Sequence, residues 1–245
     1  MRLRLQTDLV TDPTTASAPP AQLGYDELPR LIALMTGDEK HSQSADSTLD
    51  VLWVLYDRVL NVAPATADDP DRDRFLLSKG HGPTAYYAVL AAKGFIPIET
   101  LHTFGAFDSP LGYHPDRMLI RGVEISSGSL GHGLPIGVGV ALGLHAQERR
   151  SRIVVLVGDA ELEEGSNHEA IALAGRMGLD RLTVVVVDNR SATYGWPGGI
   201  AARFELEGWA AEPVDGRDHD ALAAALTSEH RGKPNVVVAQ VEKGA

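Results

Sequence analysis

Two uninterrupted runs of mostly β-branched residues constrain the fold of this chain more than any other feature of its sequence. The runs are Ile153–Val157 and Leu182–Val187, and residues typical of turns bound each of them. Continuous rather than alternating hydrophobicity is typical of strands that are covered on both faces, as in parallel sheets. Between the runs, Asn167–Met177 carries small and apolar residues spaced for one helical face. The sequence therefore predicts a strand–helix–strand unit.

The remainder of the chain is consistent with the same fold class. Helical periodicity begins at Tyr25 and returns over Leu49–Val62 and around Asp220–Leu226, and a further strand is predicted over Asn235–Val241. The 245 residues, of which 44% are hydrophobic, are enough to bury a full core. We therefore predict a doubly wound α/β domain with a mostly parallel sheet flanked by helices.

This domain is expected to occupy residues 25–245. Before it, residues 1–24 are rich in Thr, Ala, Pro and Asp and show no periodicity, which predicts a flexible N-terminal arm.

Charge and composition exclude several kinds of function. The formal net charge of −11 argues against a nucleic-acid or anionic-membrane surface, since both favour a basic face. The absence of cysteine excludes a disulfide framework, a thiolate metal site and a cysteine nucleophile. No apolar segment follows the basic residues Arg2 and Arg4, and no apolar run is long enough to span a bilayer. We expect a cytoplasmic protein with no nucleic-acid or membrane partner.

Polar residues directly follow both predicted strands. Asp159 lies within Gly158-Asp159-Ala160 after the first strand, and Asn189 opens the turn after the second. The carboxyl ends of neighbouring parallel strands meet at one sheet edge, where ligands bind. Carboxylate and amide oxygens suit Mg²⁺ or Ca²⁺, with other positions left for phosphate oxygens, water and a backbone carbonyl. Alternatively, Asp159 caps a helix and Asn189 makes a turn, but their joint placement favours the metal site.

A glycine-rich segment, Glu124–Leu134, carries a second set of candidates. Glycine lacks a Cβ, so backbone there can approach a ligand or another helix closely. The Ser-Ser-Gly-Ser stretch at residues 126–129 predicts the start of a helix with free N–H groups. The alternative is a tightly packed glycine-rich helix without a ligand.

Two short segments place histidines among glycines and prolines. They are Phe75–Gly82, which contains His81, and Leu111–Asp116, which contains His114. Histidine titrates near neutral pH and can move protons on and off hydroxyl and carbonyl oxygens. The alternative for any single histidine is an ordinary surface or capping residue, but these settings favour a functional role.

Taken together, these segments resemble the transketolase family of thiamine diphosphate enzymes. Gly158-Asp159-Ala160 followed by Asn189 resembles the family's Gly-Asp-Gly…Asn cofactor motif, with alanine in place of the last glycine. Residues 127–133 resemble its Thr-Gly-Ser-Leu-Gly-Gln-Gly segment, and residues 77–82 its Leu-Ser-Lys-Gly-His-Gly signature. The likeness runs from about Leu28 to Gly244. It implies the thiamine diphosphate-binding fold, in the form that holds the diphosphate.

The resemblance also implies a cofactor site. Mg²⁺ (or Ca²⁺) would be bound by Asp159, the Asn189 side chain and the Ser191 carbonyl, and would bridge the diphosphate oxygens. The residues implied to contact thiamine diphosphate are His81, Gly128, Leu130, Gly158, Asp159, Ala160, Glu164 and Asn189.

Catalytic roles follow from the same resemblance. His81 and His114 would line the channel to the thiazolium ring, and His41 would act on substrate from a loop that differs from the family's. Glu164 would lie at a subunit interface near the cofactor, although a surface carboxylate is the competing interpretation. The neighbouring Glu161 and Glu163 are expected to be solvated or to cap a helix.

The implied activity is transfer of a two-carbon ketol unit from a ketose or keto donor to an aldehyde-like acceptor. A full transketolase is more than twice as long, and its other half holds the glutamate that activates the aminopyrimidine. We therefore expect a separately encoded pyrimidine-domain partner, in an α2β2 assembly. Three alternatives stay open: the α subunit of a 2-oxo acid dehydrogenase or decarboxylase, a non-catalytic partner-binding paralogue and, more weakly, a dinucleotide enzyme, for which no Gly-x-Gly-x-x-Gly follows a strand.

Overall fold

The fold is built on a five-stranded sheet in which every pair of neighbours is parallel. In the computed structural model of the chain, residues 23–36 and 42–241 are described. The strand order is β1-β2-β3-β5-β4. The strands are β1 (Arg74–Leu77), β2 (Ile153–Gly158), β3 (Leu182–Asp188), β4 (Ala210–Asp215) and β5 (Asn235–Gln240). The prediction of a parallel α/β sheet is confirmed.

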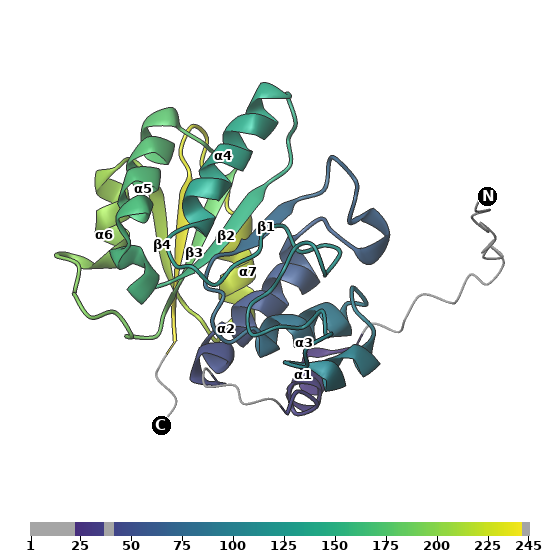
Figure 1. Cartoon of the computed structure of the whole chain (residues 1–245). Helices are drawn as coiled ribbons and strands as arrows, with labels where there is room; N and C mark the ends of the chain where they lie inside the picture. Colours follow the sequence, from purple (N-terminus) through teal and green to yellow (C-terminus); the bar gives the residue numbers. More distant parts are fainter. Residues whose placement is uncertain (1–22, 37–41, 242–245) are drawn as a thin grey trace, which may run out of the picture.

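Helices cover both faces of the sheet (Figure 1). One face is packed by α1 (Leu28–Ile32), α2 (Ser42–Val54), α3 (Thr84–Ala92) and α7 (His219–Thr227). The other face is packed by α4 (Gly133–Ala146), α5 (Gly165–Met177) and α6 (Gly199–Leu206). The domain is therefore doubly wound. Among the described residues, no helix is both long enough and apolar enough to cross a membrane.

Strand β2 shows why the apolar runs are continuous. Val154 and Leu156 belong to the core cluster on one face, whereas Val155 and Val157 belong to the cluster on the other. Because both faces are covered, polar residues have no place in the middle of such a strand.

The predicted strands in the second half of the chain are confirmed, with ends that differ by one residue or less. Two further strands were not predicted. β1 has only four residues, and β4 contains Pro213 and is half-exposed at the far edge of the sheet. Proline cannot donate to a ladder and is confined to edge strands or bulges, so its presence argued against a strand.

Two predicted helix boundaries are wrong. The segment expected over Leu49–Val62 is α2, which begins at Ser42 and passes into a π-helical turn over Leu55–Val59. The helix expected to start within residues 126–129 begins only at Gly133. Gly128 and Gly131 have φ of +127° and +80°, which no helix accommodates, so the preceding residues form a loop. The arm predicted over residues 1–24 falls almost entirely outside the described residues.

Candidate functional site

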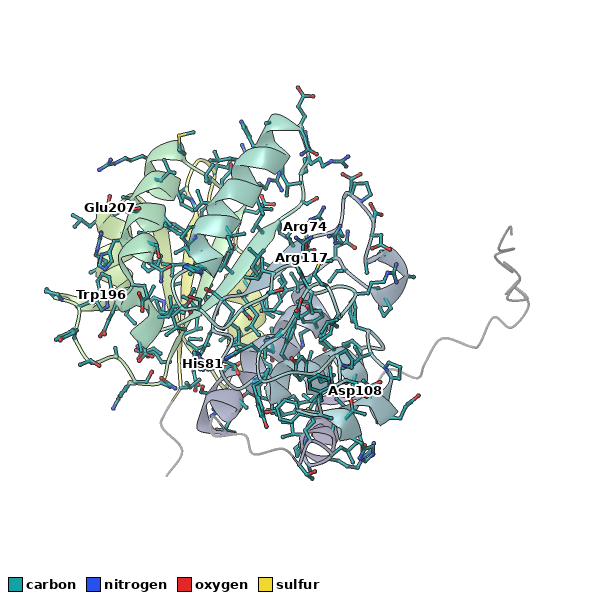
Figure 2. All side chains as sticks on the ribbon, viewed as in Figure 1. Arg74, His81, Asp108, Arg117, Trp196 and Glu207 are labelled. Carbon is teal, nitrogen blue, oxygen red and sulfur yellow. The ribbon has the colours of Figure 1, made fainter. Side chains whose placement is uncertain are left out.

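Three neighbouring strands direct polar residues to the same edge of the sheet. Ser78 and Lys79 follow β1, Asp159 follows β2 and Asn189 follows β3. Since β2 lies between β1 and β3, Asp159 occupies the centre of the row. Asp159 and Asn189 thus emerge from adjacent strands, as the sequence predicted. In Figure 2, His81 lies at this lower edge, whereas Arg74 lies at the upper end of β1.

Asp159 is almost fully enclosed, with 1% of its surface exposed. Its carboxylate accepts a hydrogen bond from the backbone N–H of Ala160 at 2.9 Å, which caps the 3₁₀ turn Ala160–Glu163. It also accepts from the backbone N–H and hydroxyl of Ser191 at 2.7 and 2.6 Å, and from the N–H of Ala192 at 3.2 Å. Asp159 therefore does cap a helical turn, as the alternative interpretation expected. The same carboxylate also joins the turn after β3 to the end of β2.

Asn189 presents a buried side-chain oxygen, Oδ1, that has no hydrogen-bond partner among the described residues. Burying such an acceptor without a partner is unfavourable, and each case in a native structure calls for an explanation. Two other side-chain oxygens near this edge, Ser127 Oγ and Asn167 Oδ1, are also buried and find no partner in the part of the chain that the structure describes. These oxygens suit a ligand that brings a cation or hydrogen-bond donors.

The charged side chains alone do not make a metal site. Within the described residues, no group of three His, Cys, Asp or Glu side chains could hold an ion. An ion next to Asp159 would therefore depend on the Asn189 amide oxygen, on backbone carbonyls and on oxygens that a ligand brings. Such a donor set fits Mg²⁺, which commonly combines one or two carboxylates with phosphate oxygens.

Glu161 corrects an expectation drawn from the sequence. It is not solvated, because only 1% of its surface is exposed, and it is not a helix cap, because none of its donors lies in the first turn of a helix. Its carboxylate accepts from the Ser78 hydroxyl, from Gly131 N–H at 3.0 Å and from Gly158 N–H at 3.3 Å. Burial raises the pKa of this carboxyl, although those hydrogen bonds and the nearby Lys79 oppose the shift. Glu163 instead accepts from the backbone N–H of Tyr194 at 2.6 Å.

Lys79 is a second functional candidate, and sequence reasoning missed it. It is 8% exposed, and its Nζ donates to Ser47 Oγ on α2 at 3.0 Å. Burial lowers the pKa of Lys79 to about 8, while the negative charges of Asp159 and Glu161 oppose this effect. Its position in the sequence, directly after a short strand and next to Gly80 and His81, could have indicated a place in the site.

Three segments pack against one another with no space for additional side chains. They are the glycine-rich loop, the residues after β1 and the segment that contains His114. A Cβ on Gly128 would lie 2.8 Å from the His114 ring, and one on Gly80 would lie 2.7 Å from the backbone nitrogen of Gly128. Glycine is therefore required at both positions because there is no room for a side chain. The structure thus places Gly80, Gly128 and His114 against one another.

His81 and His114 form an edge-on pair, with ring centroids 5.2 Å apart and ring planes at 79°. Nδ1 of His114 donates to the carbonyl oxygen of Gly80 at 3.1 Å, since a carbonyl can only accept. In the neutral ring this leaves Nε2 as an acceptor.

Glu164 lies close to the glycine-rich loop, which includes Leu130. Glu164 is exposed at the start of α5, and a Cβ on Gly131 would come within 2.6 Å of its Cβ. Leu130 is half-buried. Glu164 is thus in contact with the glycine-rich loop at Gly131. His41 lies outside the described residues.

Comparison with known proteins identifies the family. The model described as transketolase, thiamine diphosphate binding domain, matches residues 33–244. The chain belongs to the transketolase family. Among solved structures, transketolase from Leishmania mexicana superimposes with a TM-score of 0.73 at 26% identity, covering 90% of this chain and 37% of that one. This transketolase-family chain therefore spans little more than a third of the length of that solved structure.

Several relatives of similar length are named as single subunits of transketolases. The chain is 36% identical to one of the subunits of apulose-4-phosphate transketolase from Actinobacillus succinogenes, covering 92% of this chain and 88% of the relative. It is 34% identical to the SqwG subunit of 6-deoxy-6-sulfo-D-fructose transketolase from a Clostridium species, covering 83% of this chain and 77% of the relative.

A third relative, named ferredoxin fas2, from Rhodococcoides fascians, is 59% identical over 91% of this chain and 74% of its own length. The present transketolase-family sequence contains no cysteine, so these 245 residues cannot hold a cysteine-ligated iron–sulfur cluster.

Proposed function

We propose that this chain is the diphosphate-binding subunit of a two-component, thiamine diphosphate-dependent transketolase-like enzyme. It would work in the cytoplasm with a separate pyrimidine-domain partner, in an α2β2 assembly. The observation that carries this proposal is the pair of Asp159 and Asn189 at adjacent strand ends, where the Asn189 Oδ1 is buried without a partner among the described residues. Relatives named as transketolase subunits support this function over a 2-oxo acid dehydrogenase subunit or an idle paralogue.

The residues present fit a metal-bridged diphosphate. Asp159, the Asn189 side chain and the Ser191 carbonyl would hold Mg²⁺ or Ca²⁺ as hard oxygen ligands. Gly128, Leu130 and the Gly158–Ala160 turn would contact the cofactor. When bound, thiamine diphosphate supplies the nucleophilic carbon that accepts the two-carbon unit.

The chain's own residues would bind the cofactor and handle protons. His114 is oriented by its Nδ1 hydrogen bond to Gly80, so Nε2 can take a proton from a substrate hydroxyl. His81 packs edge-on against that ring and would share this role. Glu164, exposed beside the glycine loop, would face the partner protein, and His41 is proposed to act on substrate from its own loop.

Cofactor titration of the reconstituted pair tests the proposal. The chain is co-expressed with the product of the neighbouring reading frame, purified, and titrated with thiamine diphosphate with and without Mg²⁺. We expect Mg²⁺-dependent binding that Asp159→Ala abolishes and Asp215→Ala retains. Asp215 is the matched control because it also accepts a backbone N–H just after a strand, but at the far edge of the sheet. Binding that is unaffected by Asp159→Ala would contradict the proposal.

Substrates require a separate screen. Ketol transfer is assayed with phosphorylated and unphosphorylated ketoses as donors, with apulose 4-phosphate and 6-deoxy-6-sulfo-D-fructose included because two relatives carry those names. We expect two-carbon transfer to an aldehyde acceptor only when both components are present. Decarboxylation of a 2-oxo acid without ketol transfer would support the dehydrogenase alternative.

A further inference from the structure

Glu161 joins three segments around the candidate cofactor site, although it is not among the residues expected to touch the cofactor. Oε1 accepts from the Ser78 hydroxyl and from Gly131 N–H at 3.0 Å. Oε2 accepts from Gly158 N–H at 3.3 Å. One carboxylate therefore connects the end of β1, the glycine-rich loop and the end of β2.

Two further contacts extend this network into the flanking helices. The Ser78 hydroxyl, while donating to Glu161, accepts from Gly133 N–H at 3.0 Å at the start of α4. The backbone oxygen of Glu161 accepts from Asn167 Nδ2 at 2.7 Å in the first turn of α5. The elements that carry Asp159 and the glycine-rich loop are thus linked through a single residue.

The loops in this network have almost no room to shift. A Cβ on Gly133 would overlap the Ser78 side chain, and one on Gly131 would lie 2.8 Å from the Ser166 Oγ. The Ser166 hydroxyl also donates to the Gly131 carbonyl at 2.6 Å. Because these segments are in close contact, a displacement of one of them would also displace its neighbour.

A carboxylate with 1% of its surface exposed is unfavourable unless hydrogen bonds compensate for its lost hydration. An apolar residue would fill the same space without that penalty, so the carboxylate needs a reason beyond packing. Hydrogen bonds to a charged acceptor are roughly twice as strong as neutral ones, and they fix geometry more tightly.

We propose that Glu161 is a positioning residue, which holds the segment Gly128–Gly133 at a fixed distance from Asp159 through Ser78, Gly131 and Gly158. The inference rests on the proposed function, because the geometry that it maintains is that of the cofactor site. Glu161 is expected to act on cofactor affinity and turnover without contacting substrate.

Glu161→Gln in the co-purified pair provides the test. Glutamine keeps the size and one acceptor oxygen, but it places an NH₂ group where Gly158 N–H now donates. We expect the Kd for thiamine diphosphate at saturating Mg²⁺ to rise at least tenfold and kcat to fall, with the donor KM changed less than twofold. The matched control is Glu169→Gln, an exposed glutamate on α5, which should leave all three values within twofold.

Ser78→Ala removes the hydroxyl between Glu161 and Gly133. Like Glu161→Gln, it should raise the Kd for thiamine diphosphate. It replaces Glu161→Gln in the test if that variant does not fold. The inference is overturned if the tested variant binds thiamine diphosphate with a Kd within twofold of the wild-type value. A lowered melting temperature with an unchanged Kd also overturns it, because that result would indicate a purely structural role. If the wild-type pair itself binds no thiamine diphosphate, the proposed function fails instead.

Discussion

Ser191 donates two hydrogen bonds to Asp159, one from its backbone N–H to Oδ2 at 2.7 Å and one from its hydroxyl to Oδ1 at 2.6 Å. The turn after β3 is therefore fastened to the end of β2 before any ligand binds. With Ala160 and Ala192 also donating, each carboxylate oxygen accepts two hydrogen bonds, which uses the about four lone-pair sites of a carboxylate. A bound ion would therefore replace some of these contacts. Removing Asp159 would disturb this turn as well as a bound ion, so Asn189 provides a cleaner probe of binding.

Replacing Asn189 should separate binding from stability. Its Oδ1 has no hydrogen-bond partner among the described residues, so Asn189→Ala removes an unfavourable buried acceptor. We expect the free energy of unfolding without cofactor to change by about 1 kcal/mol or less. Cofactor affinity of the pair should fall at least tenfold. Chemical denaturation and calorimetric titration measure the two quantities, and unchanged affinity would contradict a ligand role for Asn189.

Two glycine-to-alanine changes should have opposite effects on stability. Gly128 has φ of +127°, and an added Cβ would meet the His114 ring at 2.8 Å, so Gly128→Ala should destabilise the protein by about 1–3 kcal/mol. Gly139 lies on the exposed side of α4 with nothing within 4 Å of an added Cβ. Gly139→Ala should therefore stabilise by about 1 kcal/mol. Urea denaturation of both variants measures these changes in the free energy of unfolding. Equal changes in the two variants would contradict the prediction.

Acid stability should depend on Asp50. Its carboxylate accepts from Tyr25, Arg217 and His219 at 2.6, 2.6 and 2.8 Å. Burial disfavours the charged form, but these hydrogen bonds outweigh it and lower the pKa of Asp50 below its ordinary 3.8. A lowered folded-state pKa stabilises the protein above the unfolded-state value, and this stability is lost as the pH falls through the folded-state value.

Wild type should therefore exceed Asp50→Asn in stability by about 1–3 kcal/mol at pH 7. The difference should shrink below about pH 4. Denaturation curves from pH 7 to pH 3 measure it, with Asp26→Asn at an exposed position as control. A gap that is constant with pH would show that the charge of Asp50 is unimportant.

His114 should affect turnover more than cofactor binding. His114→Ala removes the ring whose Nδ1 is held by Gly80, and loss of a positioned proton-transfer group typically lowers turnover by about 10²–10⁴-fold. The Kd for thiamine diphosphate should change less than about fivefold. Steady-state assays of the pair test this, with the exposed His102→Ala as control. A selective loss of cofactor affinity would assign His114 to binding instead.

The sequence predicted the centre of the sheet well and its edges poorly. The runs that became β2 and β3 are apolar throughout because helices bury both of their faces. β1 is too short for a pattern, and Pro213 obscured β4 at the opposite edge. The helix before the π-turn begins earlier than its apolar spacing indicated, since its first turn is polar.

The site was predicted where local motifs define it and missed where distant contacts do. Asp159 and Asn189 each follow a recognisable strand, so their convergence could be expected from topology. Glu161 resembles its acidic neighbours in the sequence, and its burial depends on Ser78 and Gly131, which lie 83 and 30 residues away along the chain. No local pattern encodes such contacts.

Mn²⁺ binding to the co-purified pair, followed by electron paramagnetic resonance, tests the metal site most directly. Mn²⁺ prefers the same hard oxygen ligands as Mg²⁺. The described residues offer no cluster of three acidic, histidine or cysteine ligands, so the protein alone should bind it weakly. We expect one tight Mn²⁺ per copy of this chain only when thiamine diphosphate is present, and loss of that site in Asp159→Ala and Asn189→Ala. Equally tight Mn²⁺ without thiamine diphosphate, or in both variants, would contradict a diphosphate site at the ends of β2 and β3.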